Sequence, residues 1–197
     1  ETTLPANETK KEFDKKPVLE RFDHQLKISG LKTFHTLKPD FSWGCSNIDK
    51  LISKYNLSDY ILLFPFCSEH LQQKKWPYYD QLIKLIKQNH PNLKIVIAPG
   101  PDEIEKAKKL DAVSILKEDK AISISELAGL IKRSKFVVAN DTGPAHMAAH
   151  LNVKGLSLFG SHTTAYKVSI ERENFKAIQV SDLKNLSAEK VFERLVF

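Results

Sequence analysis

Short apolar runs alternate with amphipathic stretches along most of this chain, and this alternation is the feature that most constrains its fold. The runs are rich in Val, Ile and Leu, as in strands that are covered on both faces of a parallel sheet. The predicted strands are "DYILLFPF" (59–66), "NLKIVIAPG" (92–100), "AVSILK" (112–117), "KFVVAN" (135–140), "KGLSLFG" (154–160) and "KAIQV" (176–180). Strands separated by single helices predict right-handed crossovers, so the expected fold class is α/β, with a doubly wound, Rossmann-like parallel sheet.

The stretches between these runs have the period of helices. The predicted helices are "SNIDKLISKYN" (46–56), "WPYYDQLIKLIKQNH" (76–90), "DEIEKAKKL" (102–110), "SISELAGLIKRS" (123–134), "PAHMAAHLN" (144–152) and "SAEKVFERLVF" (187–197). Ser46 is a candidate N-cap, and Ser123 with Glu126 has the spacing of a capping box. Pro77 is tolerated in a first helical turn, so we expect it inside the start of the second helix.

The sequence divides into two parts at about residue 43. Residues 1–16 have many charges and no apolar period, so they predict a flexible lead-in, and "VLERFDHQLKISGL" (18–31) has a helical period. We therefore interpret residues 1–43 as a lead-in and interdomain linker. Residues 44–197 are expected to form one Rossmann-like domain.

Charge and cysteine content limit the class of protein. The net charge of +6 comes from 30 basic residues mixed among 24 acidic ones, so a solvated lysine-rich surface competes with an anionic partner, and no RNA motif or basic stripe favours nucleic acid. Cys45 and Cys67 stand far apart, which indicates neither a disulfide framework nor a zinc site and favours reducing cytosol. The longest apolar run is far shorter than the about 20 residues of a membrane-spanning helix, so any membrane contact is expected to be peripheral.

Ligands of doubly wound sheets bind at the carboxyl ends of the strands. One such end carries "ANDTGPAH" (139–146), where Asp141 and Thr142 are good N-cap residues and Gly143 permits close approach of a backbone. The amides from Gly143 to His146 are expected to be free and to bind a phosphate, with His146 as a further donor. The alternative is a strong helix start with a core histidine.

Two more loops leave the same edge of the predicted sheet. "FPFCSEHLQQKKWP" (64–77) is long for such a connection. Ser68 could offer a hydroxyl to a phosphate, and either Lys74 or Lys75 could offer a positive charge. The alternative is a pair of solvated lysines beside a packing tryptophan. In "APGPDE" (98–103), the carboxylate of Asp102 or Glu103 could bind a ribose diol or simply favour the start of a helix.

Taken together, these motifs resemble one known family. "NDTGPAHMAAHLNVKGLSLFG" resembles the signature of the ADP-heptose:lipopolysaccharide heptosyltransferases, glycosyltransferase family nine, and "PFCSEHLQQKKWPYYDQL" resembles their phosphate loop. The resemblance covers about residues 17–197. It implies the C-terminal, donor-binding half of a two-domain GT-B enzyme, which lacks the N-terminal acceptor domain and its catalytic aspartate.

The resemblance also implies a reaction and a set of residues. The reaction would be an inverting transfer of a heptose from a nucleoside diphosphate, expected to be ADP-heptose, to a membrane-linked glycan such as a lipopolysaccharide core, in the cytoplasm or at the inner face of the membrane. No metal or other cofactor is implied. The implied catalytic residues are Lys74 and His146. The implied donor-binding residues are Ser68, Lys74, Asp141, Thr142, Gly143 and His146, with Glu103 at the nucleoside ribose.

The sequence departs from the family pattern at the phosphate loop. Phe66 and Cys67 follow Pro65 where the family usually has Gly and Ala, and "FGSHTTAY" (159–166) replaces the usual Phe-Gly-Pro-Thr run. A bulky Phe66 could reshape the approach to a diphosphate. A nucleotide-binding or nucleotide-sugar-binding module without transfer activity is therefore the alternative hypothesis.

Overall fold

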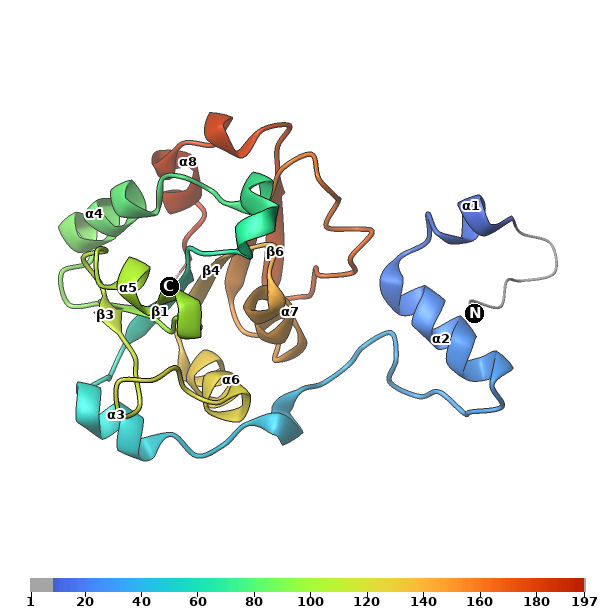
Figure 1. Ribbon diagram of the computed structural model, residues 1–197, viewed down its shortest axis with the longest axis horizontal. Helices are drawn as coiled ribbons and strands as arrows, with labels where there is room; N and C mark the ends of the chain where they lie inside the picture. Colours follow the sequence, from blue (N-terminus) through green and yellow to red (C-terminus); the bar gives the residue numbers. More distant parts are fainter. Residues whose placement is uncertain (1–8, 197) are drawn as a thin grey trace.

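The computed structural model describes residues 9–196 and is centred on one parallel sheet (Figure 1). The strands are β1 (Tyr60–Phe64), β2 (Lys94–Ile97), β3 (Val113–Ser114), β4 (Phe136–Asn140), β5 (Gly155–Phe159) and β6 (Phe175–Gln179). Their order across the sheet is β3-β2-β1-β4-β5-β6, so the winding direction reverses between β1 and β4. This order confirms the predicted doubly wound α/β class.

Helices cover both faces of the sheet. One face packs against α3 (Asp49–Tyr55), α6 (Ile124–Arg133) and α7 (Gly143–His150), and the other against α4 (Tyr79–Asn89), α5 (Ile104–Ala107) and α8 (Ala188–Phe192). Side chains alternate between the two cores along each strand, as Leu62 and Leu63 of β1 do. Burying each such side chain contributes about 1.5–3 kcal/mol, which explains why apolar runs without polar alternation form these strands.

The helix starts agree with the sequence signals in one case and differ in another. At the start of α6 the Ser123 hydroxyl accepts the Glu126 N–H, and the Glu126 carboxylate accepts the Ser123 N–H, which confirms the predicted capping box. Ser46 does not cap α3, because its own N–H donates to the Ser125 carbonyl and the helix begins three residues later. The side chain of Asn47 accepts the first helical N–H instead.

Short 3₁₀ helices replace or extend several predicted elements. They are η1 (Ser42–Gly44), η2 (Glu69–Lys74), η3 (Pro101–Glu103) and η4 (Leu183–Asn185). The helix predicted over 102–110 is thus split between η3 and the single turn of α5. β3 is also shorter than predicted, because only its two residues pair with β2 at the edge of the sheet.

The two helices nearest the N-terminus, α1 (Lys10–Phe13) and α2 (Val18–Ile28), lie to one side of the sheet in Figure 1. The N–H of Val18 donates to the Lys167 carbonyl, and the ring of Phe13 is buried against His24. The helix expected from residue 18 onward is therefore present. Residues 1–8 of the predicted lead-in lie outside the described residues, and the division at residue 43 stays a prediction.

Candidate functional site

The loops after β1 and β4 leave the sheet where its winding direction reverses, and Asn140 joins them. This last residue of β4 is fully buried. Its side-chain oxygen accepts the Trp76 N–H at 3.1 Å, and its amide nitrogen donates to the Phe66 carbonyl at 3.4 Å. Since the loop stays bonded to Asn140 as far as Trp76, α4 begins only at Tyr79. The prediction that Pro77 lies inside the first turn of this helix is therefore wrong.

Trp76 anchors the loop on its other side. The indole is fully buried, and its N–H donates to the Leu186 carbonyl at 2.7 Å. The expectation of a packing tryptophan is thus correct, but the two lysines before it differ from each other. Lys75 is exposed, whereas the ammonium of Lys74 turns inward to Asp141.

Asp141 is the centre of a cluster of charged and polar side chains. Its carboxylate is 4% exposed, and its Oδ2 lies 2.7 Å from the Lys74 ammonium and 3.1 Å from Nε2 of His162. Its Oδ1 lies 3.5 Å from Nε2 of His146. We call Lys74, Asp141, His146 and His162 the carboxylate cluster.

The cluster keeps Asp141 ionised. Burial alone would raise the pKa of this carboxyl, but hydrogen bonds from His146, Lys74 and His162, together with the charge of Lys74, hold it well below its usual range. An ionised carboxylate can only accept hydrogen bonds, so the imidazole of His162 carries its proton on Nε2. His146 is 32% exposed, which excludes the alternative of a core histidine.

The turn after Asp141 opens helix α7 without a side-chain cap. Thr142 stands at the N-cap position, and its hydroxyl donates to the Asn140 carbonyl instead of accepting a helical N–H. The N–H groups of Ala145 and His146 both donate to the Thr142 carbonyl, so the expectation that these two amides are free is wrong. Gly143 is exposed, and a Cβ added there would meet no atom within 4 Å.

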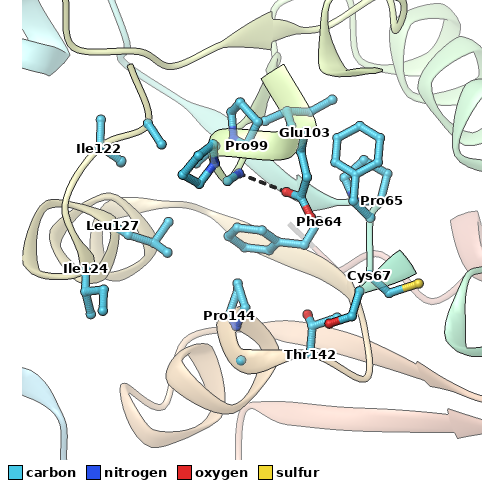
Figure 2. A pocket seen from close by; sticks show the side chains of 18 of the residues that line it. Phe64, Pro65, Cys67, Pro99, Glu103, Ile122, Ile124, Leu127, Thr142 and Pro144 are labelled. Carbon is cyan, nitrogen blue, oxygen red and sulfur yellow. Dashed lines mark hydrogen bonds between the residues drawn. The ribbon is translucent and has the colours of Figure 1, made fainter. Parts of the chain in front are cut away.

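A cavity of about 560 Å³ opens on one side of this turn (Figure 2). Its walls come from the ends of β1 and β2, from the start of α6 and from Thr142, Gly143 and Pro144. In Figure 2 the rings of Phe64, Pro99 and Pro144 and the side chains of Ile122 and Leu127 line it with carbon. The volume and the mostly apolar lining suit a small organic ligand.

Ser68 and Glu103 also line the cavity. The carboxylate of Glu103 accepts the Gly100 N–H at 2.8 Å, drawn as the dashed line in Figure 2. The helix-start interpretation of Glu103 therefore describes a real contact, and the same side chain faces the cavity. Lys74, Asp141 and His146 do not line the cavity, although Asp141 directly precedes Thr142, which does.

The predicted residues thus meet at one edge of the sheet in two groups. Ser68, Glu103, Thr142 and Gly143 face the cavity, and Lys74, Asp141 and His146 form the cluster beside it. Sequence reasoning missed His162, whose loop has no regular period. The nearest signal was the departure of "FGSHTTAY" from the family pattern.

Other classes of site find no support in the part of the chain from residue 9 to 196. No group of three or more His, Cys, Asp or Glu side chains there is placed to hold a metal ion. Cys45 and Cys67 are not bonded to each other. None of the helices described for this chain is long and apolar enough to cross a bilayer.

A family model described as "Glycosyltransferase family 9 (heptosyltransferase)" matches residues 8–194. The chain belongs to this family. A curated relative, lipopolysaccharide heptosyltransferase 1 of Campylobacter coli, is 29% identical over 114 residues, which are 53% of this chain and 33% of the relative.

Solved heptosyltransferases have the same fold. The Escherichia coli heptosyltransferase WaaC with ADP superposes with a TM-score of 0.66 and 23% identity, over 88% of this chain and 54% of WaaC. The family 9 glycosyltransferase of Veillonella parvula superposes with a TM-score of 0.69 and 15% identity, over 98% of this chain and 61% of its own. The chain thus spans about half the length of these structures, and it has the fold of the C-terminal half of a GT-B heptosyltransferase.

Proposed function

We propose that this chain is the donor-binding half of a family 9 glycosyltransferase and that its ligand is a nucleoside-diphosphate sugar. ADP-heptose is the expected donor, because the signature resembles that of the heptosyltransferases and the matched WaaC structure was solved with ADP. The sugar would pass with inversion to a membrane-linked glycan such as a lipopolysaccharide core. Residues 44–197 would form the donor domain, with residues 1–43 as the linker.

One observation supports this proposal: the start of α7, which has no side-chain cap, lines the cavity and directly follows Asp141 of the carboxylate cluster. A nucleoside would occupy the cavity, with its base between the apolar walls and its ribose at Glu103. The diphosphate would then lie at Thr142 and Gly143, where a helix N-terminus carries partial positive charge. Ser68 would donate its hydroxyl to the same phosphates.

The chemistry follows from where charge develops. Cleavage of the sugar–phosphate bond leaves negative charge on the departing diphosphate, and groups that meet this charge lower the barrier. Lys74 and His146 would donate hydrogen bonds to the departing diphosphate from the cluster, where both contact Asp141 before the ligand binds. The base that activates the acceptor hydroxyl would come from an N-terminal acceptor domain, as the family resemblance implies.

Calorimetric titration with ADP, UDP, GDP and ADP-heptose tests the donor site. We expect binding that is selective for the adenine nucleotides and that weakens about tenfold or more in Lys74→Met and His146→Ala, since each loses a hydrogen bond to a charged group. Lys75→Met is the matched control, because this neighbouring lysine is exposed and lies outside the cluster. Absence of binding in a folded wild-type protein would contradict the proposal.

Transfer activity separates this proposal from a binding module without activity. The isolated chain is expected to bind the donor but to transfer sugar poorly, because the acceptor domain would supply the base. Adding a separately made acceptor domain of the family should restore transfer. If transfer stays absent although the donor binds, the module without activity is favoured.

The place of action proposed for this chain is the cytoplasm, peripheral to the inner face of the membrane. The net charge of +6 would favour an anionic leaflet. Sedimentation with vesicles tests this idea: binding should be stronger to vesicles with anionic lipid than to neutral ones. Equal partitioning onto both would contradict it.

A further inference from the structure

His162 and Lys74 hydrogen-bond the same oxygen of a buried carboxylate. The distances to Oδ2 of Asp141 are 3.1 Å from Nε2 of His162 and 2.7 Å from the Lys74 ammonium. The other oxygen, Oδ1, has a longer contact with His146 at 3.5 Å. One carboxylate oxygen therefore holds both a movable lysine and a histidine from another loop.

The loop that carries His162 is held from the side of β6. The amide of Gln179 donates to the Gly160 carbonyl at 2.6 Å and to the Thr163 carbonyl at 3.1 Å, and its oxygen accepts the Ala165 N–H at 3.3 Å. These bonds fix the backbone before and after the histidine. The loop therefore presents the imidazole in one position.

The imidazole itself is enclosed. The His162 side chain is 8% exposed, and its ring stacks on Phe159 with 6.0 Å between the ring centres and 12° between the planes. Its Nδ1 is buried and has no hydrogen-bond partner among the described residues. Among residues 9–196, the hydrogen bond to Asp141 is thus the polar contact of this buried ring. It fixes the direction in which Nε2 points.

The proposed reaction requires Lys74 to leave Asp141 for a phosphate. Lys74 is 23% exposed and has a long flexible stem, whereas Asp141 is 4% exposed and ionised. A buried charge that loses its partner is costly, and the cost would rise beside an anionic diphosphate. A second donor that stays on the same oxygen reduces this cost.

We propose that His162 is a positioning residue that holds the Asp141 carboxylate while Lys74 moves to the phosphate of a bound nucleoside diphosphate. This inference rests on the proposed function. His162 needs no contact with the ligand, since it acts by keeping Oδ2 satisfied.

Titration with ADP of two variants tests the proposal. His162→Phe keeps a flat ring on Phe159 but removes the donor, and the affinity for ADP should fall about tenfold, as for a hydrogen bond to a charged group. His162→Gln places an amide nitrogen near the position of Nε2 and should restore most of the affinity. His90→Phe and His90→Gln, at an exposed histidine outside the site, are the matched controls and should bind like the wild type.

A double-mutant cycle with Lys74→Met gives the readout that a purely structural role would not change. If His162 acts through Lys74, Lys74→Met should weaken ADP binding much less in the His162→Phe background than in the wild type. Additive losses, or wild-type affinity in a folded His162→Phe, would overturn the inference. If His162→Phe does not fold, His162→Asn replaces it, because its shorter amide leaves Oδ2 without a donor.

The same titration distinguishes a failure of the proposed donor binding from a failure of the proposed role of His162. A folded wild type that binds neither ADP nor ADP-heptose would refute the proposed function. A wild type that binds ADP, together with a His162→Phe variant that binds it equally well, would refute only the role of His162.

Discussion

The two sides of the turn at residues 141–143 differ in what they are made of. On the cavity side the walls are mostly apolar, and Glu103 carries the charge among the described lining residues. On the cluster side, Lys74, His146 and His162 all contact the carboxylate of Asp141, which is almost fully buried. The cavity side therefore offers mostly apolar contacts to a ligand, whereas Lys74 and His146 already contact Asp141 and have to exchange this partner to bind a phosphate.

This contrast predicts different responses to substitution. Changes in the cluster should affect the folded state, because its members depend on one another. Changes on the cavity side should affect the ligand and leave the fold unchanged.

The largest effect is expected from Asp141→Ala. It leaves the buried Nε2–H of His162 without its acceptor, and an unsatisfied buried donor costs about 1–3 kcal/mol of unfolding free energy, to which the loss of the contact with Lys74 adds. Urea denaturation measures the loss, and Asp102→Ala, at an exposed carboxylate, is the control. Equal stability of the two variants would show that the cluster contributes nothing to the fold.

Gly143→Ala tests whether a residue on the cavity side serves the ligand and not the fold. Gly143 has no positive φ and a Cβ there meets nothing, so the fold does not require glycine and the melting temperature should stay unchanged. A methyl group would stand where we place the diphosphate, so the affinity for ADP should fall by about tenfold, or about 1.4 kcal/mol. An unchanged affinity for ADP would contradict the placement of the phosphate at this turn.

Acid should weaken the region at the far end of α7. Burial, together with smaller contributions from the charges of Arg172 and His146, lowers the pKa of His150 to about 4. The unfolded chain takes up its proton near pH 6.5, so the stability from neutral His150 is complete above that pH and is lost as pH falls toward 4. We expect a loss on the order of 1 kcal/mol, reduced by partial exposure of the group.

His150→Gln provides the comparison for this pH dependence. The amide does not titrate in this range, so its unfolding free energy should vary less between pH 6.5 and 4 than that of the wild type. Parallel curves for the two proteins would assign the acid sensitivity to other groups.

The smallest effect is expected at Glu103. If its carboxylate binds the ribose diol, the wild type should prefer ADP to 2′,3′-dideoxy-ADP by about fivefold, as for one net hydrogen bond. Glu103→Ala should remove this preference. A preference that persists in the variant would mean that Glu103 serves only the Gly100 N–H.

The strands could be predicted because burial on both faces leaves a continuous apolar run, as in β1, β4 and β5. The start of α4 could not, because it depends on the long-range bond between Trp76 and Asn140, which are 64 positions apart. The same limit applies to the site. Ser68, Lys74 and Gly143 lie in recognisable motifs, whereas His162 reaches Asp141 only through a loop braced by Gln179, a tertiary contact without a local pattern.

The bond between the Trp76 indole and the Leu186 carbonyl also has a consequence for the order in which the protein is made. A ribosome delivers residue 76 long before residue 186, and domains complete their packing as their later segments emerge. During synthesis, the loop that carries Lys74 therefore lacks this second anchor until the segment before α8 has been added. We infer that this loop becomes rigid among the last parts of the domain, although the central strands β1 and β4 are already available to pair.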